Sequence, residues 1–238
     1  MKGIVLAGGT GSRLLPLTKV TNKHLLPVGK EPMIFHPIKK LLEAKVRDIL
    51  IVTGTEHMGD VVGLLGSGKD FDCEFTYRVQ DRAGGIAEAL GLSRDFVHGG
   101  RMVVVLGDNI FQDSIAPHVD RFAKQDRGAR ILLKEVPDPK RYGVAEIAGD
   151  RVVGIEEKPA KPKSMMAVTG VYMYEESVFD IVDSLKPSRR NELEITDVNN
   201  AYIARGELSF DVLDGWWTDA GTHESLKRAS ALVAGEIE

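Results

Sequence analysis

The stretch KGIVLAGGTGSRLLPLT, residues 2–18, decides how the chain begins to fold. Its first half is an apolar run, which is typical of a strand buried on both faces. The turn that follows, residues 8–11, has almost no side chains, because glycine stands at Gly8, Gly9 and Gly11, and the fixed charge of Arg13 comes soon after. A glycine-rich turn between a strand and a helix favours phosphate, since its backbone N–H groups can converge on oxygen atoms. The opening therefore predicts an α/β fold with a phosphate-binding turn after the first strand.

Three phosphate-binding motifs compete for this turn. A P-loop requires Gly-Lys followed by Ser or Thr, which the stretch lacks. A dinucleotide fingerprint requires a third glycine where Leu14 stands, so an NAD-dependent oxidoreductase is a weak alternative. The third motif uses Arg13 together with Lys23, because two cations beside a nest of amides suit a triphosphate whose outer part leaves as pyrophosphate. A structural glycine turn with surface cations also remains open.

Short β-branched runs alternate with helical patterns through the first half of the chain. We expect strands at 2–8, 48–54, 74–80, 101–109 and 129–136, and helices at 32–46, 58–66, 84–97 and 115–125. This alternation predicts βαβ units with right-handed crossovers. The fold class is therefore α/β, with a Rossmann-like, mostly parallel central sheet flanked by helices.

The pattern changes after about residue 137. We expect a hairpin over 142–159 that turns at Gly149–Asp150, which forms a small antiparallel portion. A strand at 167–174, a helix at 195–206, an edge strand at 207–213 and a closing helix at 223–235 follow. We expect one domain over residues 1–238, with a nucleotide-binding half at about 1–136 and a second-substrate half at about 137–238.

Composition excludes several classes of protein. The net charge is -4 and no long run of Lys or Arg is present, so a nucleic-acid polymer is not an expected partner. The single cysteine cannot form an internal disulfide, and no Cys/His spacing suggests zinc. No segment approaches 18 apolar residues, and the apolar stretch at the N-terminus is too short for a signal peptide. We expect a cytoplasmic protein that does not associate with membranes.

Motifs along essentially the whole chain resemble the sugar-1-phosphate nucleotidylyltransferases. The opening motif, at 3–18 and 22–34, is shared by relatives that join a nucleotide to a sugar phosphate. Later motifs resemble the short-form thymidylyltransferase branch: RVQDRAGGIAEAL, VLGDNIF, DPKRYGVAEI, EEKPAKPKS, AVTGVYMY, NELEITDVNNAY and WWTDAGTHESL. The resemblance implies transfer of a thymidylyl group from dTTP to α-D-glucose 1-phosphate, which gives dTDP-glucose and pyrophosphate. It also implies Mg²⁺ as cofactor and a homo-oligomer.

Two acidic residues are the candidate metal ligands. Asp108 follows an apolar strand, and a carboxylate at the carboxyl end of a central parallel strand points into the crevice where ligands bind. The resemblance adds Asp219, and hard oxygen ligands from two distant segments suit Mg²⁺. Asp219 could instead cap the closing helix, but Thr222 is better placed for that role.

The remaining nucleotide contacts come from the resemblance together with residue chemistry. Gln80 ends a predicted strand, and its carboxamide offers a donor and an acceptor to the edge of a pyrimidine ring. Gly85 begins the next helix, where glycine lets the backbone approach a ring closely. The full nucleotide-binding set is Leu6, Gly8, Gly9, Gly11, Arg13, Lys23, Gln80, Gly85 and Asp108. The residues expected to act in catalysis are Arg13, Lys23, Lys158 and Asp108.

The sugar phosphate is assigned to the second half of the chain. Glu157 suits sugar hydroxyls and Lys158 suits a phosphate, but on a regular strand the two would face opposite sides. We therefore expect the strand to break before Pro159. The full set that the resemblance implies for sugar phosphate is Asn109, Tyr142, Gly143, Glu157, Lys158, Val168, Arg190 and Glu192.

Two positions depart from the family pattern. His24 stands where longer relatives carry Gln, and the charge of an imidazole would vary near a pH of about 6.5. Asn191 stands where relatives often have Gly, which bears on the loop of Arg190. Two functional alternatives stay open: the same chemistry with UTP or another sugar 1-phosphate, and a non-catalytic nucleotide-sugar sensor. A sensor would be expected to lose Arg13, Asp108 or Asp219, and all three are present.

Overall fold

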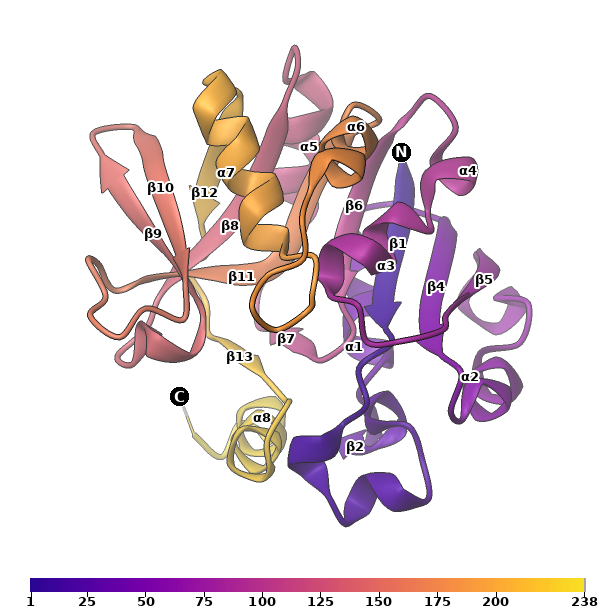
Figure 1. The fold of residues 1–238 in the computed structure, drawn as a ribbon. Helices are drawn as coiled ribbons and strands as arrows, with labels where there is room; N and C mark the ends of the chain where they lie inside the picture. Colours follow the sequence, from indigo (N-terminus) through magenta and orange to yellow (C-terminus); the bar gives the residue numbers. More distant parts are fainter. Residues whose placement is uncertain (238) are drawn as a thin grey trace.

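The computed structural model describes residues 1–237 and is built around one nine-stranded sheet (Figure 1). The strands follow the order β10-β9-β11-β6-β1-β4-β5, while β8 pairs with β11 and carries β12 at its outer edge. Their bounds are β1 (Lys2–Ala7), β4 (Asp48–Gly54), β5 (Glu74–Gln80), β6 (Arg101–Leu106), β8 (Ala129–Glu135), β9 (Gly143–Ala148), β10 (Arg151–Glu157), β11 (Met166–Glu175) and β12 (Leu208–Val212). The expected α/β class is confirmed.

The first half of the chain forms the parallel part of this sheet. Strands β6, β1, β4 and β5 run side by side, and Val5 at the centre pairs with both Ile51 and Val105. Because these strands are parallel, their carboxyl ends meet at one edge of the sheet. Ala7, Gly54, Gln80 and Leu106 end the four strands at that edge, which is where a ligand crevice is expected.

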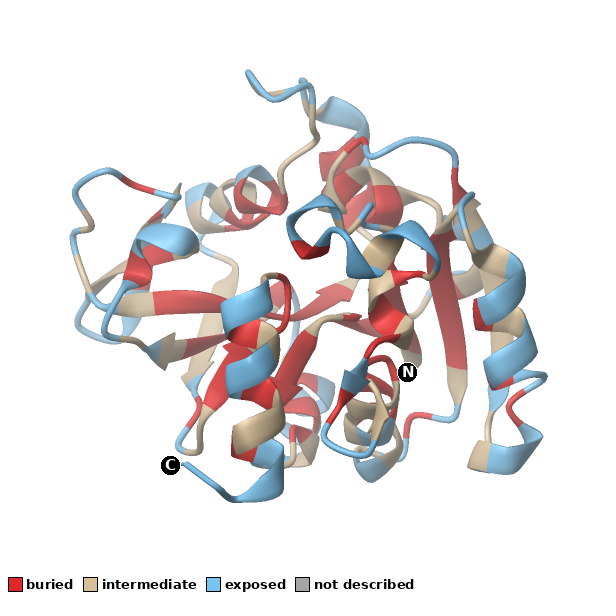
Figure 2. Cartoon of the chain, turned by 90° about the horizontal axis from the view of Figure 1, so that it is seen from below, coloured by how far each residue is buried: buried red, intermediate tan, exposed pale blue. Residues whose placement is uncertain are grey.

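Helices cover both faces of the sheet, and each face has its own apolar core. One core joins the sheet to α3 (Ile86–Gly91), α4 (Arg94–Val97), α6 (Val178–Ser184) and α7 (Ile195–Arg205). The other joins it to α1 (Phe35–Glu43), α2 (Met58–Leu65) and α5 (Ala116–Lys124). In Figure 2 the strands are largely buried, while the outward faces of the helices are exposed. None of the helices within residues 1–237 is long and apolar enough to cross a membrane.

The second half adds antiparallel strands to the same sheet. Strand β11 runs antiparallel to β6, and the β9–β10 hairpin pairs with the sheet through Val144 and Ala167. The predicted turn between Ala148 and Arg151 and the predicted edge position of β12 are both confirmed. The small antiparallel portion is therefore continuous with the main sheet.

One local expectation is wrong, and two features were not expected. The glycine turn leads into the short 3-10 helices η1 (Ser12–Leu14), η2 (Leu17–Lys19) and η3 (Lys23–Leu25), so no α-helix begins before Phe35. The helix expected at 84–97 is divided into α3 and α4, because the Ser93 hydroxyl donates to the Leu90 carbonyl at 2.6 Å and competes with the helical pattern. Helix α6 was not expected.

A two-stranded ribbon joins distant parts of the chain. Strand β7 (Asn109–Phe111) pairs antiparallel with β13 (Trp217–Asp219), and Asn109 lies opposite Asp219. A second small ribbon pairs β2 (Pro27–Val28) with β3 (Glu31–Pro32). The closing helix α8 (His223–Ala234) packs beside β2 in a third apolar cluster that contains Leu14, Ala220 and Ala229 (Figure 1). The segment that follows the glycine turn and the closing helix therefore pack together, although they are far apart in the chain.

The start of α8 decides between the two roles open to Asp219. Thr222 is the N-cap residue, and its side chain forms a reciprocal capping box with Ser225. The expectation that Thr222 rather than Asp219 caps this helix is confirmed. The Asp219 carboxylate is consequently available for another role.

Candidate active site

A cavity of about 350 Å³ lies at the carboxyl edge of the parallel strands. This volume falls within the range of small-molecule sites. Eight of the nine residues assigned to nucleotide binding line it: Leu6, Gly8, Gly9, Arg13, Lys23, Gln80, Gly85 and Asp108. Gly11 does not line it. Instead, Gly11 has a positive φ of 66° and its carbonyl accepts a hydrogen bond from Thr18, so it shapes the loop from behind.

A second cavity adjoins the first on the side of the antiparallel strands. It is lined by most of the residues assigned to sugar phosphate: Asn109, Tyr142, Gly143, Glu157, Lys158 and Val168. Arg190 and Glu192 line the first cavity instead. The two cavities share Arg13, Asp108, Glu157 and Lys158. Two ligands placed one in each cavity would therefore meet beside two cations and two carboxylates.

Asp108 is held at this junction by two side chains, and one of them is fixed by two further segments. Lys23 Nζ donates to Asp108 Oδ2 at 2.6 Å, and Asn109 Nδ2 donates to Oδ1 at 3.0 Å. Asn109 is fixed in turn, because its Oδ1 accepts from the Gly170 amide and from Trp217 Nε1. Burial alone would raise the pKa of Asp108, but the Lys23 ammonium and these hydrogen bonds hold it well below its ordinary value. The carboxylate stays ionised although it is buried.

Asp219 reaches the same junction from strand β13. Its Oδ1 accepts from the Tyr142 hydroxyl at 3.1 Å and from Arg141 at 3.4 Å. Burial, followed by the Asp219 charge, raises the pKa of Tyr142 to about 12, so this hydroxyl remains a donor. Asp219 Oδ2 faces the opposite way, toward Gly221.

Gly221 marks the place where the charged groups converge. A Cβ atom added at Gly221 would lie 3.1 Å from both Asp219 Oδ2 and Arg13 Nη2, and 3.5 Å from Asp108 Oδ2. Oxygen atoms of both acids therefore fall within 3.5 Å of one point. Two hard carboxylate oxygens that face a polar cavity fit a Mg²⁺ ion, provided that the Lys23 ammonium turns from Asp108 Oδ2 toward the phosphates when the ion binds. The donor set thus suits the metal that the sequence motifs imply.

The strand break expected beside Glu157 occurs one residue before Pro159. Strand β10 ends at Glu157, and Lys158 takes a positive φ of 46° while its amide donates to the Tyr142 carbonyl. Both side chains consequently line both cavities. Glu157 Oε2 accepts from the Thr196 hydroxyl at 2.9 Å, which fixes the carboxylate in the wall.

Asn191, which departs from the family pattern, occupies a left-handed position in the Arg190 loop. Asn191 has a positive φ of 58°, a conformation that asparagine tolerates better than most residues other than glycine. Arg190 donates to both oxygens of Glu194 and lies 3.6 Å from Glu157. The substitution of Asn for Gly is therefore compatible with the loop.

His24 does not behave as a surface imidazole. It is 1% exposed, and its Nδ1 lies 2.8 Å from Asn22 Oδ1. Burial, followed by the positive charge of Lys23, lowers the pKa of His24 to about 3. The expectation that its charge varies near pH 6.5 is therefore wrong, and the ring is neutral at physiological pH.

The neutral state of His24 gives a prediction for stability. Below a pH of about 6.5 the unfolded chain protonates this ring while the folded chain does not, so the free energy of unfolding falls as pH falls toward 3. His24→Gln removes this contribution. Between about pH 4 and 6 we expect the free energy of unfolding to fall less steeply with falling pH in the variant than in the wild type. The two slopes should differ by up to about 1.4 kcal/mol per pH unit. Denaturant unfolding across this range measures the slopes, and parallel curves would contradict the assignment.

Several lining residues were not found from the sequence. Tyr172, Thr196 and Asn199 line the second cavity. Asn199 is 1% exposed, its Oδ1 accepts from Tyr174, and its Nδ2 is one of two buried side-chain polar atoms in residues 1–237 without a hydrogen-bond partner. Trp217 and Arg141 also line this cavity, and both neighbour residues that the motifs did identify. Asn199 lies within the quoted motif NELEITDVNNAY, but no role was assigned to it, because its position inside α7 does not show that it faces a cavity.

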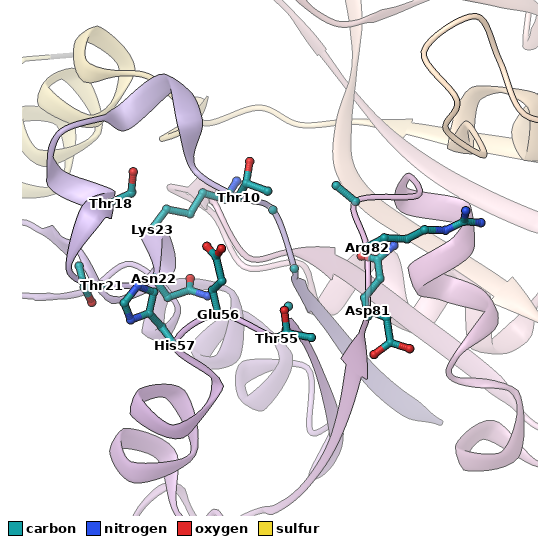
Figure 3. Close-up of a pocket in the computed structure, with 15 residues that line it drawn as sticks. Thr10, Thr18, Thr21, Asn22, Lys23, Thr55, Glu56, His57, Asp81 and Arg82 are labelled. Carbon is teal, nitrogen blue, oxygen red and sulfur yellow. The ribbon is translucent and has the colours of Figure 1, made fainter.

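A third cavity lies on the other side of the Gly8–Gly9 loop (Figure 3). Figure 3 shows Lys23 extending toward Thr10, with Glu56 and His57 from the loop after β4 below them. It shares Gly8, Gly9, Lys23 and Gln80 with the first cavity. The loop is therefore accessible from both sides.

Comparison with known proteins agrees with this architecture. Residues 2–236 match the family described as Nucleotidyl transferase. A glucose-1-phosphate thymidylyltransferase of Neisseria meningitidis serogroup A is 44% identical over 237 residues, which are 98% of this chain and 82% of that protein. The resemblance inferred from the sequence motifs is confirmed.

Solved structures give the same result. A Bacillus anthracis protein described as a glucose-1-phosphate thymidylyltransferase, in complex with a sucrose, has a TM-score of 0.95 and 61% sequence identity, and the match covers 100% of this chain and 96% of that one. A UDP-glucose pyrophosphorylase complexed with UDP-glucose has a TM-score of 0.86 at 23% identity, and the match covers 99% of each chain. At that identity the second likeness shows the fold alone.

Proposed function

The chain belongs to the nucleotidyl transferase family, and on this basis we propose that it transfers a thymidylyl group from dTTP to α-D-glucose 1-phosphate, giving dTDP-glucose and pyrophosphate. The observation that carries this proposal is the junction of the two cavities. Arg13, Asp108 and Lys158 line both, so a nucleotide in the first cavity and a sugar phosphate in the second would meet beside these charges. The assignment of dTTP to the first cavity and of the sugar phosphate to the second is part of the proposal.

Asp108 and Asp219 would hold Mg²⁺, because their Oδ2 atoms face the same point beside Gly221. When bound, the ion would supply positive charge to the phosphate oxygens of the nucleotide. Asn109 supports Asp108, and Tyr142 supports Asp219, each through a hydrogen bond to the oxygen that faces away from Gly221. Such supporting contacts orient carboxylate ligands.

The attacking group needs no activation by the protein. A sugar 1-phosphate is already anionic at neutral pH, so its oxygen can attack the α-phosphorus without a general base. The chain contributes position and charge, as in other phosphoryl transfers. Lys158 would neutralise the sugar phosphate, and its place in both cavities lets it reach the reacting oxygens. Arg190 and Glu192 line the first cavity only, but Arg190 lies 3.6 Å from Glu157, so it would border the junction where the sugar phosphate meets the nucleotide.

The leaving pyrophosphate would be stabilised by Arg13, Lys23 and the amides of the glycine loop. A side chain at Gly9 would crowd the end of Lys23, because its Cβ atom would lie 3.2 Å from Lys23 Cε. Within residues 1–237 Arg13 forms no ion pair, so its guanidinium is free to bind phosphate oxygens. Lys23, whose ammonium lies 2.6 Å from Asp108, would bind the pyrophosphate oxygens from the other side of the site.

The glucose ring would lie among the polar groups of the second cavity. The Glu157 carboxylate suits sugar hydroxyls as an acceptor, and the amide nitrogen of Asn199 suits them as a donor. The backbone at Gly143 and Val168 completes the wall. We further propose that residues 1–136 and 137–238 act as the nucleotide-binding and sugar-phosphate-binding halves of one domain. We also propose that the chain forms a homo-oligomer and works in the cytoplasm.

A turnover assay tests the proposed function. The purified chain is mixed with dTTP, glucose 1-phosphate and Mg²⁺, and pyrophosphate release is coupled to detection of dTDP-glucose by chromatography. We expect both products in equal amounts. Absence of both products under conditions where dTTP binds would reject the proposal.

The preference for thymine over uracil is tested separately. Both bases carry the same N3–H and carbonyl groups, so Gln80 alone does not separate them. We expect dTTP to be used in preference to UTP when both are supplied at equal concentration. Equal incorporation, or an excess of UDP-glucose, would instead favour the alternative in which the chain uses UTP.

A further inference from the structure

We propose that Glu88 is a positioning residue that selects keto pyrimidine bases by fixing the orientation of the Gln80 carboxamide. The proposal deepens the function proposed above and rests on it for the identity of the nucleotide. Glu88 lies on α3, and neither its side chain nor its position was singled out from the sequence. It does not line the nucleotide cavity, so it acts through Gln80.

The nitrogen of the Gln80 carboxamide has two partners. Nε2 lies 3.2 Å from the Gly85 carbonyl oxygen and 3.1 Å from Glu88 Oε1. A carbonyl and an ionised carboxylate can only accept hydrogen bonds. The atom that faces them must therefore be the nitrogen, and both of its hydrogens are used.

The oxygen of the same carboxamide consequently faces the cavity. Gln80 is 7% exposed, and a Cβ atom added at Gly8 would lie 2.9 Å from Gln80 Oε1. Gly8 and Gly85 both line the nucleotide cavity, so the oxygen lies at its wall. No hydrogen bond reaches this oxygen from the described residues. The carboxamide, expected from sequence to offer a donor and an acceptor, is left with an acceptor only.

A lone acceptor at this position distinguishes the pyrimidine bases. Thymine and uracil carry a hydrogen on N3, which an acceptor binds. Cytosine has an unprotonated N3, which is itself an acceptor, so two acceptors would face each other without a hydrogen. Leaving a buried polar group unpaired in this way discriminates strongly between otherwise similar ligands.

Glu88 is itself held in place by two neighbours. Arg82 donates to Glu88 Oε2 through Nε at 3.3 Å and through Nη2 at 3.1 Å. Gly84 leaves the space that the carboxylate occupies, because a Cβ atom there would overlap both carboxylate oxygens. Residues 82–88 thus form a short segment that presents one carboxylate to Gln80.

Glu88→Gln tests the orientation directly. Arg82 can only donate, so it would take the single oxygen of the new amide and turn its NH₂ group toward Gln80. In the present orientation Gln80 Nε2 would keep only the Gly85 carbonyl as acceptor. In the rotated orientation its oxygen would instead accept from the new NH₂ group and its nitrogen would face the base, so the acceptor would no longer be fixed toward the cavity. We expect the ratio of the Kd for dCTP to the Kd for dTTP to fall at least tenfold, measured by calorimetry. The ratio for dUTP to dTTP should stay unchanged, because both bases keep N3–H.

Three further variants decide how Glu88 acts. Gly84→Ala displaces the carboxylate without replacing it and should lower the dCTP to dTTP ratio in the same direction. In a Gln80→Ala background, Glu88→Gln should produce no further change. Glu74→Gln removes an exposed carboxylate from the opposite end of β5 and should leave the ratio as in the wild type.

The outcomes separate this inference from the proposed function. If Glu88→Gln weakens dTTP, dUTP and dCTP by one common factor, or leaves all ratios unchanged, Glu88 does not orient Gln80 and the inference is wrong. A change that persists without Gln80 overturns it as well. Because these are binding measurements, they stand whether or not the turnover assay yields dTDP-glucose, and failure of turnover counts against the proposed function alone.

Discussion

Asp108→Asn is expected to lower kcat/KM for dTDP-glucose synthesis by about a thousandfold, near the upper end of what loss of one charged contact in a catalytic site costs. The asparagine keeps the shape of the side chain and its contact with Asn109 but removes the negative charge that would hold Mg²⁺. It also leaves the ammonium of Lys23, 2.6 Å away in the wild type, without its counter-charge. Coupled pyrophosphate release measures the rate.

The matched control for this prediction is Asp95→Asn. Asp95 is exposed in α4, so its replacement removes the same charge away from both cavities. The control should keep wild-type activity, and a thermal unfolding scan should show that both variants are folded. A folded Asp108→Asn enzyme with more than a tenth of wild-type kcat/KM would remove Asp108 from the proposed mechanism.

Arg13→Gln is expected to raise the activation barrier by about 3–4 kcal/mol, which is a loss of several hundredfold in kcat/KM. Arg13 lines both cavities and has no ion-pair partner within residues 1–237, so nothing in the described part of the chain replaces its charge. If Arg13 stabilises the departing pyrophosphate, kcat should fall more than the affinity for dTTP, because the added charge develops only in the transition state.

Lys19→Gln provides the control for the charge of this loop. Lys19 is exposed in η2, six positions beyond Arg13, and lines neither cavity. The Lys19→Gln variant should retain activity at every Mg²⁺ concentration. If Arg13→Gln raised KM for dTTP with kcat unchanged, Arg13 would contribute uniform binding rather than stabilise the leaving group.

The larger elements of the fold follow from local sequence patterns. Apolar strands at β1, β4 and β6 and the helices between them have strong periodicity, and glycine residues mark the ends of α7 and α8. The hairpin was predictable because Gly149–Asp150 separates two alternating runs. These features depend on residues near each other in the chain, which is why composition and spacing were enough.

The features that sequence alone did not provide depend on contacts between distant segments. Strands β7 and β13 have only three residues each and are separated by about a hundred positions, so no local pattern predicts their pairing. That ribbon nevertheless brings Asp219 opposite Asn109 and so beside Asp108. Assignment of Asp219 to the site came from family resemblance, and the ribbon now supplies its physical basis.

The protonation state and the hydrogen bonds of buried side chains could not be predicted from the sequence either. His24 reads as an ordinary imidazole in the sequence, but its burial beside Lys23 keeps it neutral. Gln80 reads as a group with both a donor and an acceptor, but Glu88 and Gly85 occupy its donors. Such properties depend on the packing around a side chain, which follows only once the strands and helices have been placed.

Metal binding provides the most direct test of the arrangement at Gly221. Manganese, which can substitute for Mg²⁺ and is visible by electron paramagnetic resonance, is titrated into the dTTP complexes of the wild type, Asp108→Asn and Asp219→Asn. We expect one tightly bound ion in the wild type and at least about a tenfold weaker affinity in each variant, since both acids would bind the same ion. Unchanged manganese affinity in either folded variant would contradict a metal site shared by Asp108 and Asp219.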